Sequence, residues 1–189
     1  MQSMLLQLEF IILSKMGFSK GFNVQLATLF GIGRIPGGGT WASLIVLLIA
    51  LYEQNAETVS FLAFFTLIIA PNAYRKLTTL VDSKDPREYV LDEVIGMGIA
   101  ISGVHIFTRI FNQFSFDFIE SLSATDELFM LTFILFRFFD ISKIGPVGWV
   151  ESNPNEKAYN RVIGDDIVAA LLSIIVVIFF LSVNLWILQ

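Results

Sequence analysis

Cysteine is absent from this sequence, and histidine occurs only once, at position 105. The lack of cysteine excludes disulfides, thiolate nucleophiles and zinc–sulfur sites. A single histidine cannot form a histidine-rich metal site, and His105 lies in an apolar run, so we expect it to be a packed residue. Neither cysteine nor histidine chemistry therefore explains what the chain does.

Charged residues are also scarce. Asp, Glu, Lys and Arg make up 15% of the 189 residues, whereas a soluble domain usually has about 25%. Hydrophobic residues make up 55%, 19 residues are Phe, and the mean hydropathy is +0.73. We therefore expect lipid to be the solvent for much of the surface. The net charge of −5 argues against nucleic-acid binding.

Long apolar segments are present instead. Only helices and closed barrels satisfy their backbone hydrogen bonds in lipid, and the alternating pattern of barrel strands is not visible here. The predicted fold class is therefore all-α: a polytopic integral membrane helical bundle with about five transmembrane or re-entrant helices. The five apolar segments are 41–52, 58–74, 94–111, 128–141 and 167–188.

The N-terminal segment, residues 1–20, lacks the basic region and the small-residue cleavage pattern of a signal peptide. We predict that it is a retained N-terminal interfacial helix. Residues 21–189 show no repeat or low-complexity tract and are predicted to form a single membrane-embedded domain. The sequence leaves the oligomeric state open.

Basic residues alternate along the chain. The segment before residue 41 and the loops 75–91 and 142–164 each hold three or four Lys or Arg. The loop 53–57 has none, and the loop 109–127 has only Arg109. Because cytoplasmic loops carry an excess of Lys and Arg, the three basic segments are predicted to face the cytoplasm.

This orientation brings the unusual polar segments to one face of the membrane. The glycine turn 31–39, the acidic stretch 85–93, the helix end 137–143 and the segment 164–166 would all lie at the cytoplasmic boundary. On the opposite side, four acidic residues are predicted to lie in a solvated loop: Asp117, Glu120, Asp126 and Glu127.

The stretch "FILFRFFDISK" places Arg137 and Asp140 inside an apolar segment. A charge near the middle of a membrane helix costs about 2.5–3.5 kcal/mol on insertion scales. Arg137, Asp140 and Lys143 are spaced i, i+3, i+6, so they share one face of a helix. Arg137 and Asp140 either pair with each other and extend to the interface, or they belong to a functional site.

Two pairs of carboxylates are predicted to open helices: Asp92 with Glu93, and Asp165 with Asp166. Each pair alone fits helix capping, because carboxylates complement the helix dipole at an N-terminus. Together with Asp140 at the same membrane face, these are more carboxylates than helix capping requires. Hard divalent cations such as Mg²⁺ choose oxygen ligands, so the cluster suggests a metal site.

Basic groups near these carboxylates suit a metal-bound phosphate. The candidates are Arg137, Lys143 and Arg34. Asp85 is a further possible ligand, although "DP" is also an ordinary turn signal.

The glycine turn "GIGRIPGGGTWAS", residues 31–43, supplies backbone amides and the hydroxyls of Thr40 and Ser43 at a helix start. Such a turn can hold an anion, but it lacks the ending of a Walker A loop. Tight helix packing explains the glycines equally well. Trp41 and Trp149 are predicted to be interfacial anchors.

Three stretches resemble, in this order and spacing, the signatures of the phosphatidylglycerophosphatase A family: "DPREYVLDEVIGM", "FRFFDISKIGP" and "GDDIVAALLS". The similarity covers about residues 28–175. It implies a bacterial cytoplasmic (inner) membrane enzyme with its active site facing the cytoplasm. The expected reaction is the Mg²⁺-dependent removal of the terminal phosphate of phosphatidylglycerophosphate, which gives phosphatidylglycerol.

The resemblance also implies site residues. The implied catalytic residues are Asp92, Glu93, Arg137, Asp140, Asp165 and Asp166. The implied substrate-binding residues are Gly39, Thr40, Ser43, Arg137 and Lys143, to which the basic residues named above add Arg34. The implied Mg²⁺ ligands are Asp85, Asp92, Glu93, Asp140, Asp165 and Asp166.

The chain departs from the family pattern in its glycine turn, which is one residue shorter than usual. Gly38 stands where a second proline is usual, and Ala42 replaces a glycine. Ile144 follows Lys143 where the family has a proline. The carboxylates are intact.

Two mechanisms remain open: attack by a metal-activated water with a carboxylate as base, which we favour, or an aspartyl-phosphate intermediate. A histidine-based lipid phosphatase needs more than one histidine, and the acidic pattern of CDP-alcohol transferases is missing. The alternative from another class is a small cation transporter or channel with an intramembrane acidic site. That alternative predicts polar residues through the helices to the far face, whereas here they stop at one side.

Overall fold

The computed structural model describes residues 21–114 and 125–187, and in these ranges every regular element is a helix. The prediction of an all-α fold is confirmed. The predicted interfacial helix at 1–20 lies outside the described residues. The elements are α2 (Phe22–Ala27), the 3₁₀ helix η1 (Leu29–Arg34), α3 (Gly38–Glu53), α4 (Glu57–Val81), α5 (Leu91–Phe114), α6 (Thr125–Ser142), α7 (Pro146–Glu151) and α8 (Ala158–Ile187).

Each predicted apolar segment falls within one of the longer helices, α3, α4, α5, α6 or α8, apart from residue 188, which lies outside the described range. Within the described residues, three helical segments are long and apolar enough to cross a membrane: Glu57–Val81, Leu91–Ile110 and Ala158–Val183. The segment Gly38–Glu53 is apolar but shorter. The count of five membrane-inserted helices therefore stays a prediction.

Two predicted helix starts are wrong. Asp165 and Asp166 do not open α8, because that helix begins at Ala158, about two turns earlier. Capping therefore does not explain this acidic pair. Asp126 and Glu127 are not in a loop but in the first turn of α6, while Asp117 and Glu120 lie outside the described residues.

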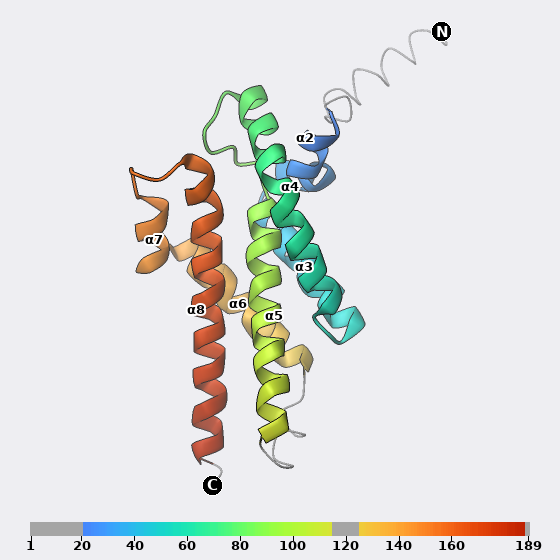
Figure 1. Cartoon of the computed structure of the whole chain (residues 1–189), viewed down its shortest axis with the longest axis vertical. Coiled ribbons are helices and arrows are strands. Elements are labelled where there is room, and N and C mark those ends of the chain that lie inside the picture. The colour runs from blue at the N-terminus through green and yellow to red at the C-terminus, as the bar shows by residue number, and fades with distance from the viewer. Residues whose placement is uncertain (1–20, 115–124, 188–189) are drawn as a thin grey trace, which may run out of the picture.

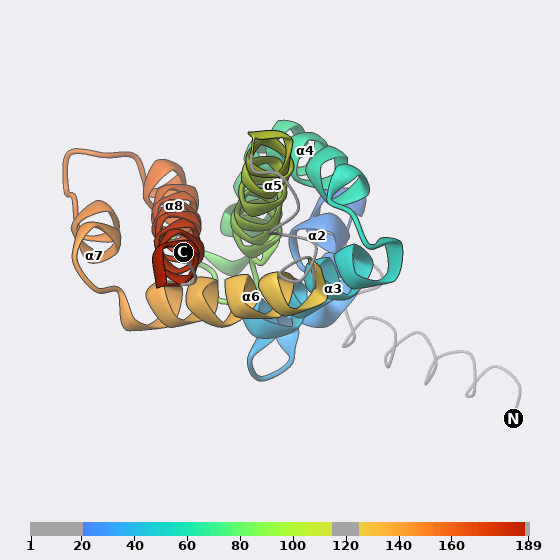
Figure 2. The ribbon, with the colours of Figure 1, turned by 90° about the horizontal axis from the view of Figure 1, so that it is seen from below.

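Helix α5 is the centre of the bundle. It packs against α3, α4, α6 and α8, and α6 crosses α5 and α8 obliquely (Figures 1 and 2). Small residues allow the close approaches: a Cβ added at Gly98 would lie 2.6 Å from the Cβ of Ala63 on α4. A Cβ at Gly96 would lie 2.8 Å from the ring of Phe136 on α6 and 3.0 Å from the Cβ of Asp166 on α8. Such small-residue contacts are typical of helices packed in a membrane.

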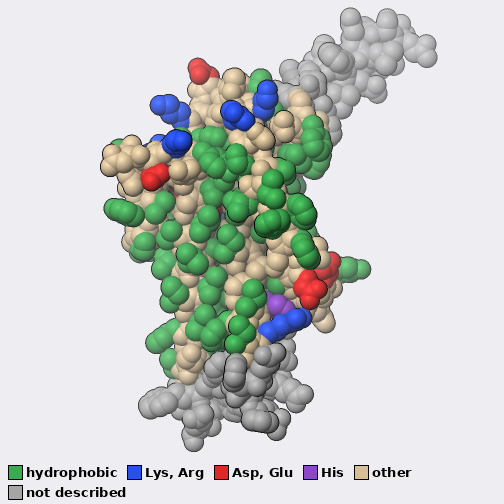
Figure 3. All heavy atoms as spheres, in the orientation of Figure 1, with side chains coloured by type: hydrophobic (Ala, Val, Ile, Leu, Met, Phe, Trp, Pro, Cys, Tyr) green, Lys and Arg blue, Asp and Glu red, His purple; other side chains and the backbone are tan. Residues whose placement is uncertain are grey.

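The surface divides into an apolar middle and a basic end. Figure 3 shows hydrophobic side chains over the middle of one face and Lys and Arg side chains gathered at the end where α4 finishes and α8 begins. Large apolar residues such as Phe61, Phe64 and Phe179 are exposed. This distribution fits a bundle whose middle lies in lipid and whose basic end lies at an interface.

His105 packs as expected. Its ring centroid lies 6.1 Å from that of Phe129, and its Nε2 atom is buried. Trp41 and Trp149 are exposed, at 49% and 69%, which is consistent with interfacial anchoring.

Replacing Gly98 by Ala should destabilise the bundle. The added Cβ overlaps a Cβ fixed to the backbone of α4, and overpacking of this kind costs about 1–3 kcal/mol, which opposes the gain of about 1 kcal/mol in helix propensity. We expect a lower midpoint of thermal unfolding in detergent. Gly21→Ala is the control, because nothing lies within 4 Å of a Cβ at Gly21. Equal midpoints for both variants would contradict the close packing of α4 on α5.

Candidate active site

A cavity of about 310 Å³ lies where the α4–α5 loop, the start of α5, the end of α6 and the first turns of α8 meet. Its walls are mostly charged. Seven of the residues predicted for the site line this one space: Asp85, Asp92, Glu93, Asp140, Lys143, Asp165 and Asp166. The structure therefore brings together residues that are as far apart along the chain as Asp85 and Asp166.

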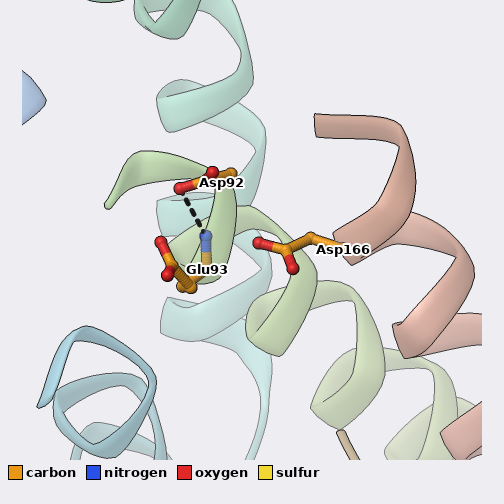
Figure 4. A group of neighbouring side chains, drawn as sticks. All are labelled: Asp92, Glu93 and Asp166. Atoms are coloured by element: carbon orange, nitrogen blue, oxygen red, sulfur yellow. Dashed lines mark hydrogen bonds between the residues drawn. The ribbon is translucent and has the colours of Figure 1, made fainter. Parts of the chain in front are cut away.

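Three carboxylates form the inner group of the site. Asp92 and Glu93 come from the first turn of α5 and Asp166 comes from α8, and Figure 4 shows them facing one another. One carboxylate oxygen from each lies within 4.8 Å of the others. The backbone N–H of Glu93 donates to Oδ1 of Asp92 at 3.1 Å, which fixes the orientation of that carboxylate.

A second group, of two carboxylates and two cations, lies beside the first. Nη1 of Arg137 contacts Oδ2 of Asp140 at 2.7 Å, and Nζ of Lys143 contacts Oδ1 of Asp140 at 3.1 Å. Lys143 also forms an ion pair with Asp165. Burial lowers the pKa of Lys143, but the carboxylates of Asp140 and Asp165 outweigh it and raise the pKa above its ordinary value. Lys143 therefore stays protonated.

The interpretation that Arg137 and Asp140 pair with each other is confirmed, but the pair does not extend into solvent. Their side chains are only 13% and 10% exposed. Arg137 donates to the buried hydroxyl of Ser43 at 3.4 Å, and it does not line the cavity. Arg137 and Ser43 thus lie behind Asp140, where they hold that carboxylate in place.

The inner group has an excess of negative charge. Among the described residues, Asp92, Glu93 and Asp166 form no ion pair with Lys or Arg. Oε2 of Glu93 is buried and has no hydrogen-bond partner there. Carboxylates this close cannot all ionise without a compensating charge. An all-oxygen donor set with one orphaned oxygen fits a hard divalent cation such as Mg²⁺.

The glycine turn contributes through packing. A Cβ at Gly39 would overlap the Glu93 carboxylate, so the missing side chain lets Glu93 approach the first turn of α3. A Cβ at Gly33 would overlap the backbone of Glu88 in the α4–α5 loop. Arg34 and Thr40, predicted to bind substrate, do not line the cavity. Asp85 does line it, but as an exposed residue at the rim.

Two features of the site were not predicted. Tyr74, Tyr89 and Tyr159 pack against each other, with centroids 5.4 Å apart for Tyr74 and Tyr89 and 5.2 Å apart for Tyr74 and Tyr159. Burial raises the pKa of Tyr89 above its ordinary value, so its hydroxyl is neutral. The cavity is also lined by Lys84, Arg87 and Arg161. In the sequence, the pattern of these basic residues predicts only the orientation of the loops in the membrane. The four-residue spacing of Arg161 and Asp165 is a signal that links Arg161 to the site.

Comparison with known proteins identifies the family. A family model described as phosphatidylglycerophosphatase A matches residues 25–181. Phosphatidylglycerophosphatase A of Haemophilus influenzae is 31% identical over 156 residues, which are 80% of this chain and 84% of that protein. No solved structure matches the chain. The resemblance and the prediction of a lipid phosphatase are confirmed, and the chain belongs to the phosphatidylglycerophosphatase A family.

Proposed function

We propose that this chain hydrolyses phosphatidylglycerophosphate to phosphatidylglycerol and inorganic phosphate, with Mg²⁺, in the cavity between α5, α6 and α8. One observation carries the proposal. Three carboxylates that have no basic partner among the described residues face a protonated lysine across the same space, in a chain of this family. The alternative of a cation transporter is not favoured, because the buried acidic residues that the structure describes all line this one cavity, and family membership points to a phosphatase.

Asp92, Glu93 and Asp166 are the proposed ligands of Mg²⁺, because within residues 21–114 and 125–187 these three form the compact carboxylate group. Bound there, the ion would neutralise the negative charge that spreads over the transferred phosphoryl group. It would also give the orphaned Oε2 of Glu93 a partner.

Lys143 is the proposed phosphate-binding cation. It lines the cavity between Asp140 and Asp165, and its ammonium group carries three N–H donors that suit phosphate oxygens. Arg137 acts through Asp140, since it contacts that carboxylate and Ser43 and stays out of the cavity. Its role is to position Asp140.

The proposed reaction is a direct hydrolysis. A water oxygen forms a bond to the terminal phosphorus, and the bond between that phosphorus and the glycerol oxygen breaks. A carboxylate of the site accepts the proton of the attacking water, and the glycerol oxygen leaves as the hydroxyl of phosphatidylglycerol after taking up a proton. The lipid tails stay in the bilayer beside the exposed apolar faces.

Purified protein should release inorganic phosphate from phosphatidylglycerophosphate in mixed micelles when Mg²⁺ is present. Excess EDTA should abolish the release, and restored Mg²⁺ should recover it, because the carboxylate group then regains its counter-charge. Phosphate release is measured colorimetrically. No release above background with Mg²⁺ would overturn the proposed function, and undiminished release in EDTA would overturn the metal requirement alone.

Asp166→Asn should lower kcat by about 100-fold or more, as expected when a charge that stabilises the transition state is removed. The amide keeps the shape of the side chain and removes the negative charge. Asp82→Asn is the matched control: Asp82 is exposed at the end of α4 and does not line the site cavity. A variant Asp166→Asn that inserts normally and retains activity would remove Asp166 from the site.

The orientation is also part of the proposal. The basic segments 75–91 and 142–164 flank the cavity, and the positive-inside rule therefore supports our proposal that the site faces the cytoplasm, in a bacterial inner membrane.

A cysteine introduced at Pro154 should be labelled by an impermeant maleimide only from the cytoplasmic side. The chain has no native cysteine, so each variant carries a single thiol. Glu53→Cys is the control, because Glu53 ends α3 just before α4 begins at the opposite end of the bundle, and it should react only from the outside. Labelling of the Pro154 position from outside intact cells would reverse the topology.

A further inference from the structure

Three basic side chains in the cavity are not used by the proposed hydrolysis. Lys84 and Arg87 come from the α4–α5 loop, and Arg161 comes from the first turns of α8. Arg161 precedes Asp165 by four residues, so both lie on one face of α8, about 6 Å apart along the axis. These three side chains, which we call the basic wall, therefore adjoin the carboxylate groups within one cavity.

Arg161 has unused hydrogen-bonding capacity in this wall. Its Nε atom is buried and has no acceptor within the part of the chain that the structure describes. In the same ranges, Lys84, Arg87 and Arg161 form no ion pair, although the acidic residues Asp85 and Glu151 line the same cavity. A buried donor without an acceptor is costly, which points to an acceptor supplied by a ligand.

The tyrosine cluster holds this wall in place. Tyr159, two residues before Arg161, packs on the ring of Tyr74. The hydroxyl of Tyr74 donates to the backbone carbonyl of Lys84. The loop that carries Lys84 and the helix that carries Arg161 are thus tied to the same side chain, so the loop backbone is held next to the first turns of α8.

We propose that Arg161, assisted by Lys84 and Arg87, binds the phosphodiester group of the lipid substrate. This inference rests on the proposed function. The substrate has two phosphates joined by one glycerol unit: the terminal monoester that is cleaved and the phosphodiester that remains in the product. The terminal phosphate lies at Lys143 and the carboxylates, and the phosphodiester lies at Arg161, whose planar fork matches two phosphate oxygens.

The consequence is selectivity between lipid phosphates. Phosphatidic acid has one phosphate and no phosphodiester, so it can occupy the reacting end of the cavity but not the basic wall. Phosphatidylglycerol has the phosphodiester but no terminal phosphate, so it can occupy only the wall. A diffuse attraction of basic residues to an anionic bilayer would instead affect both lipids alike.

The test compares Arg161→Gln with Arg75→Gln in mixed micelles. Arg75 is an exposed arginine of α4 that donates to Asn72 and does not line the cavity. For Arg161→Gln we expect KM for phosphatidylglycerophosphate to rise about tenfold while kcat falls less than about threefold, the pattern of lost ground-state binding. Its inhibition constant for phosphatidylglycerol should rise about tenfold, while that for phosphatidic acid should change less than about twofold. Arg161→Lys should give intermediate values, and Arg75→Gln should match the wild type.

An unchanged KM in Arg161→Gln, or an equal weakening of inhibition by both lipids, would overturn the inference. The double variant Lys84→Gln/Arg87→Gln alters exposed loop residues, and it supplies the same comparison if Arg161→Gln does not insert. The wild-type assay separates the two proposals. If the wild type releases phosphate and Arg161→Gln has an unchanged KM, only the phosphodiester site is refuted. If the wild type releases no phosphate, the proposed hydrolysis itself is refuted.

Discussion

The mutual repulsion of carboxylates held at a helix junction is the constraint on which the site depends. Asp92 and Glu93 on α5 meet Asp166 on α8 with oxygens within 4.8 Å of one another, and Asp140 and Asp165 lie alongside. Among the described residues, Asp140 and Asp165 have cations in ion-pair contact, Arg137 and Lys143, whereas the first three carboxylates have none. A junction that holds three such carboxylates needs an external positive charge, which is why we propose that the site acts with a divalent cation.

The packing of the bundle makes this concentration of charge possible. Gly96 brings α5 close to both α6 and α8, and Gly39 lets the Glu93 carboxylate reach the first turn of α3. The helix dipole of α3 is favourable to a carboxylate at that position. Ser43, one turn further along α3, supports Arg137 from behind. The glycine turn thus supports the site by leaving room for the Glu93 carboxylate. The tyrosine cluster supports it by packing the α4–α5 loop against α8.

Much of the fold and the carboxylate set could be predicted from the sequence. Long apolar segments require helices in lipid, and the spacing of Arg137, Asp140 and Lys143 places them on one helical face, which is how they lie. The spacing of these residues did not predict which of the two cations faces the cavity. That depends on another helix, because Arg137 donates to Ser43 on α3. The sequence did not predict the start of α8, because Asn160 and Arg161 interrupt the apolar pattern and resemble a loop. Tyr159 and Ile163, however, already pack as one face of the helix. Arg161 lines the cavity because the α4–α5 loop meets α8. Residue spacing within one segment cannot predict such a contact between two distant segments.

Direct titration with Mn²⁺, followed by electron paramagnetic resonance on detergent-solubilised protein, tests the central proposal without relying on turnover. We expect saturable Mn²⁺ binding to the wild type, displacement by excess Mg²⁺, and loss of that binding in the double variant Asp92→Asn/Glu93→Gln. The exposed variant Asp82→Asn should bind Mn²⁺ as the wild type does. Equal Mn²⁺ binding by the wild type and the double variant would contradict a metal site at the junction of α5 and α8.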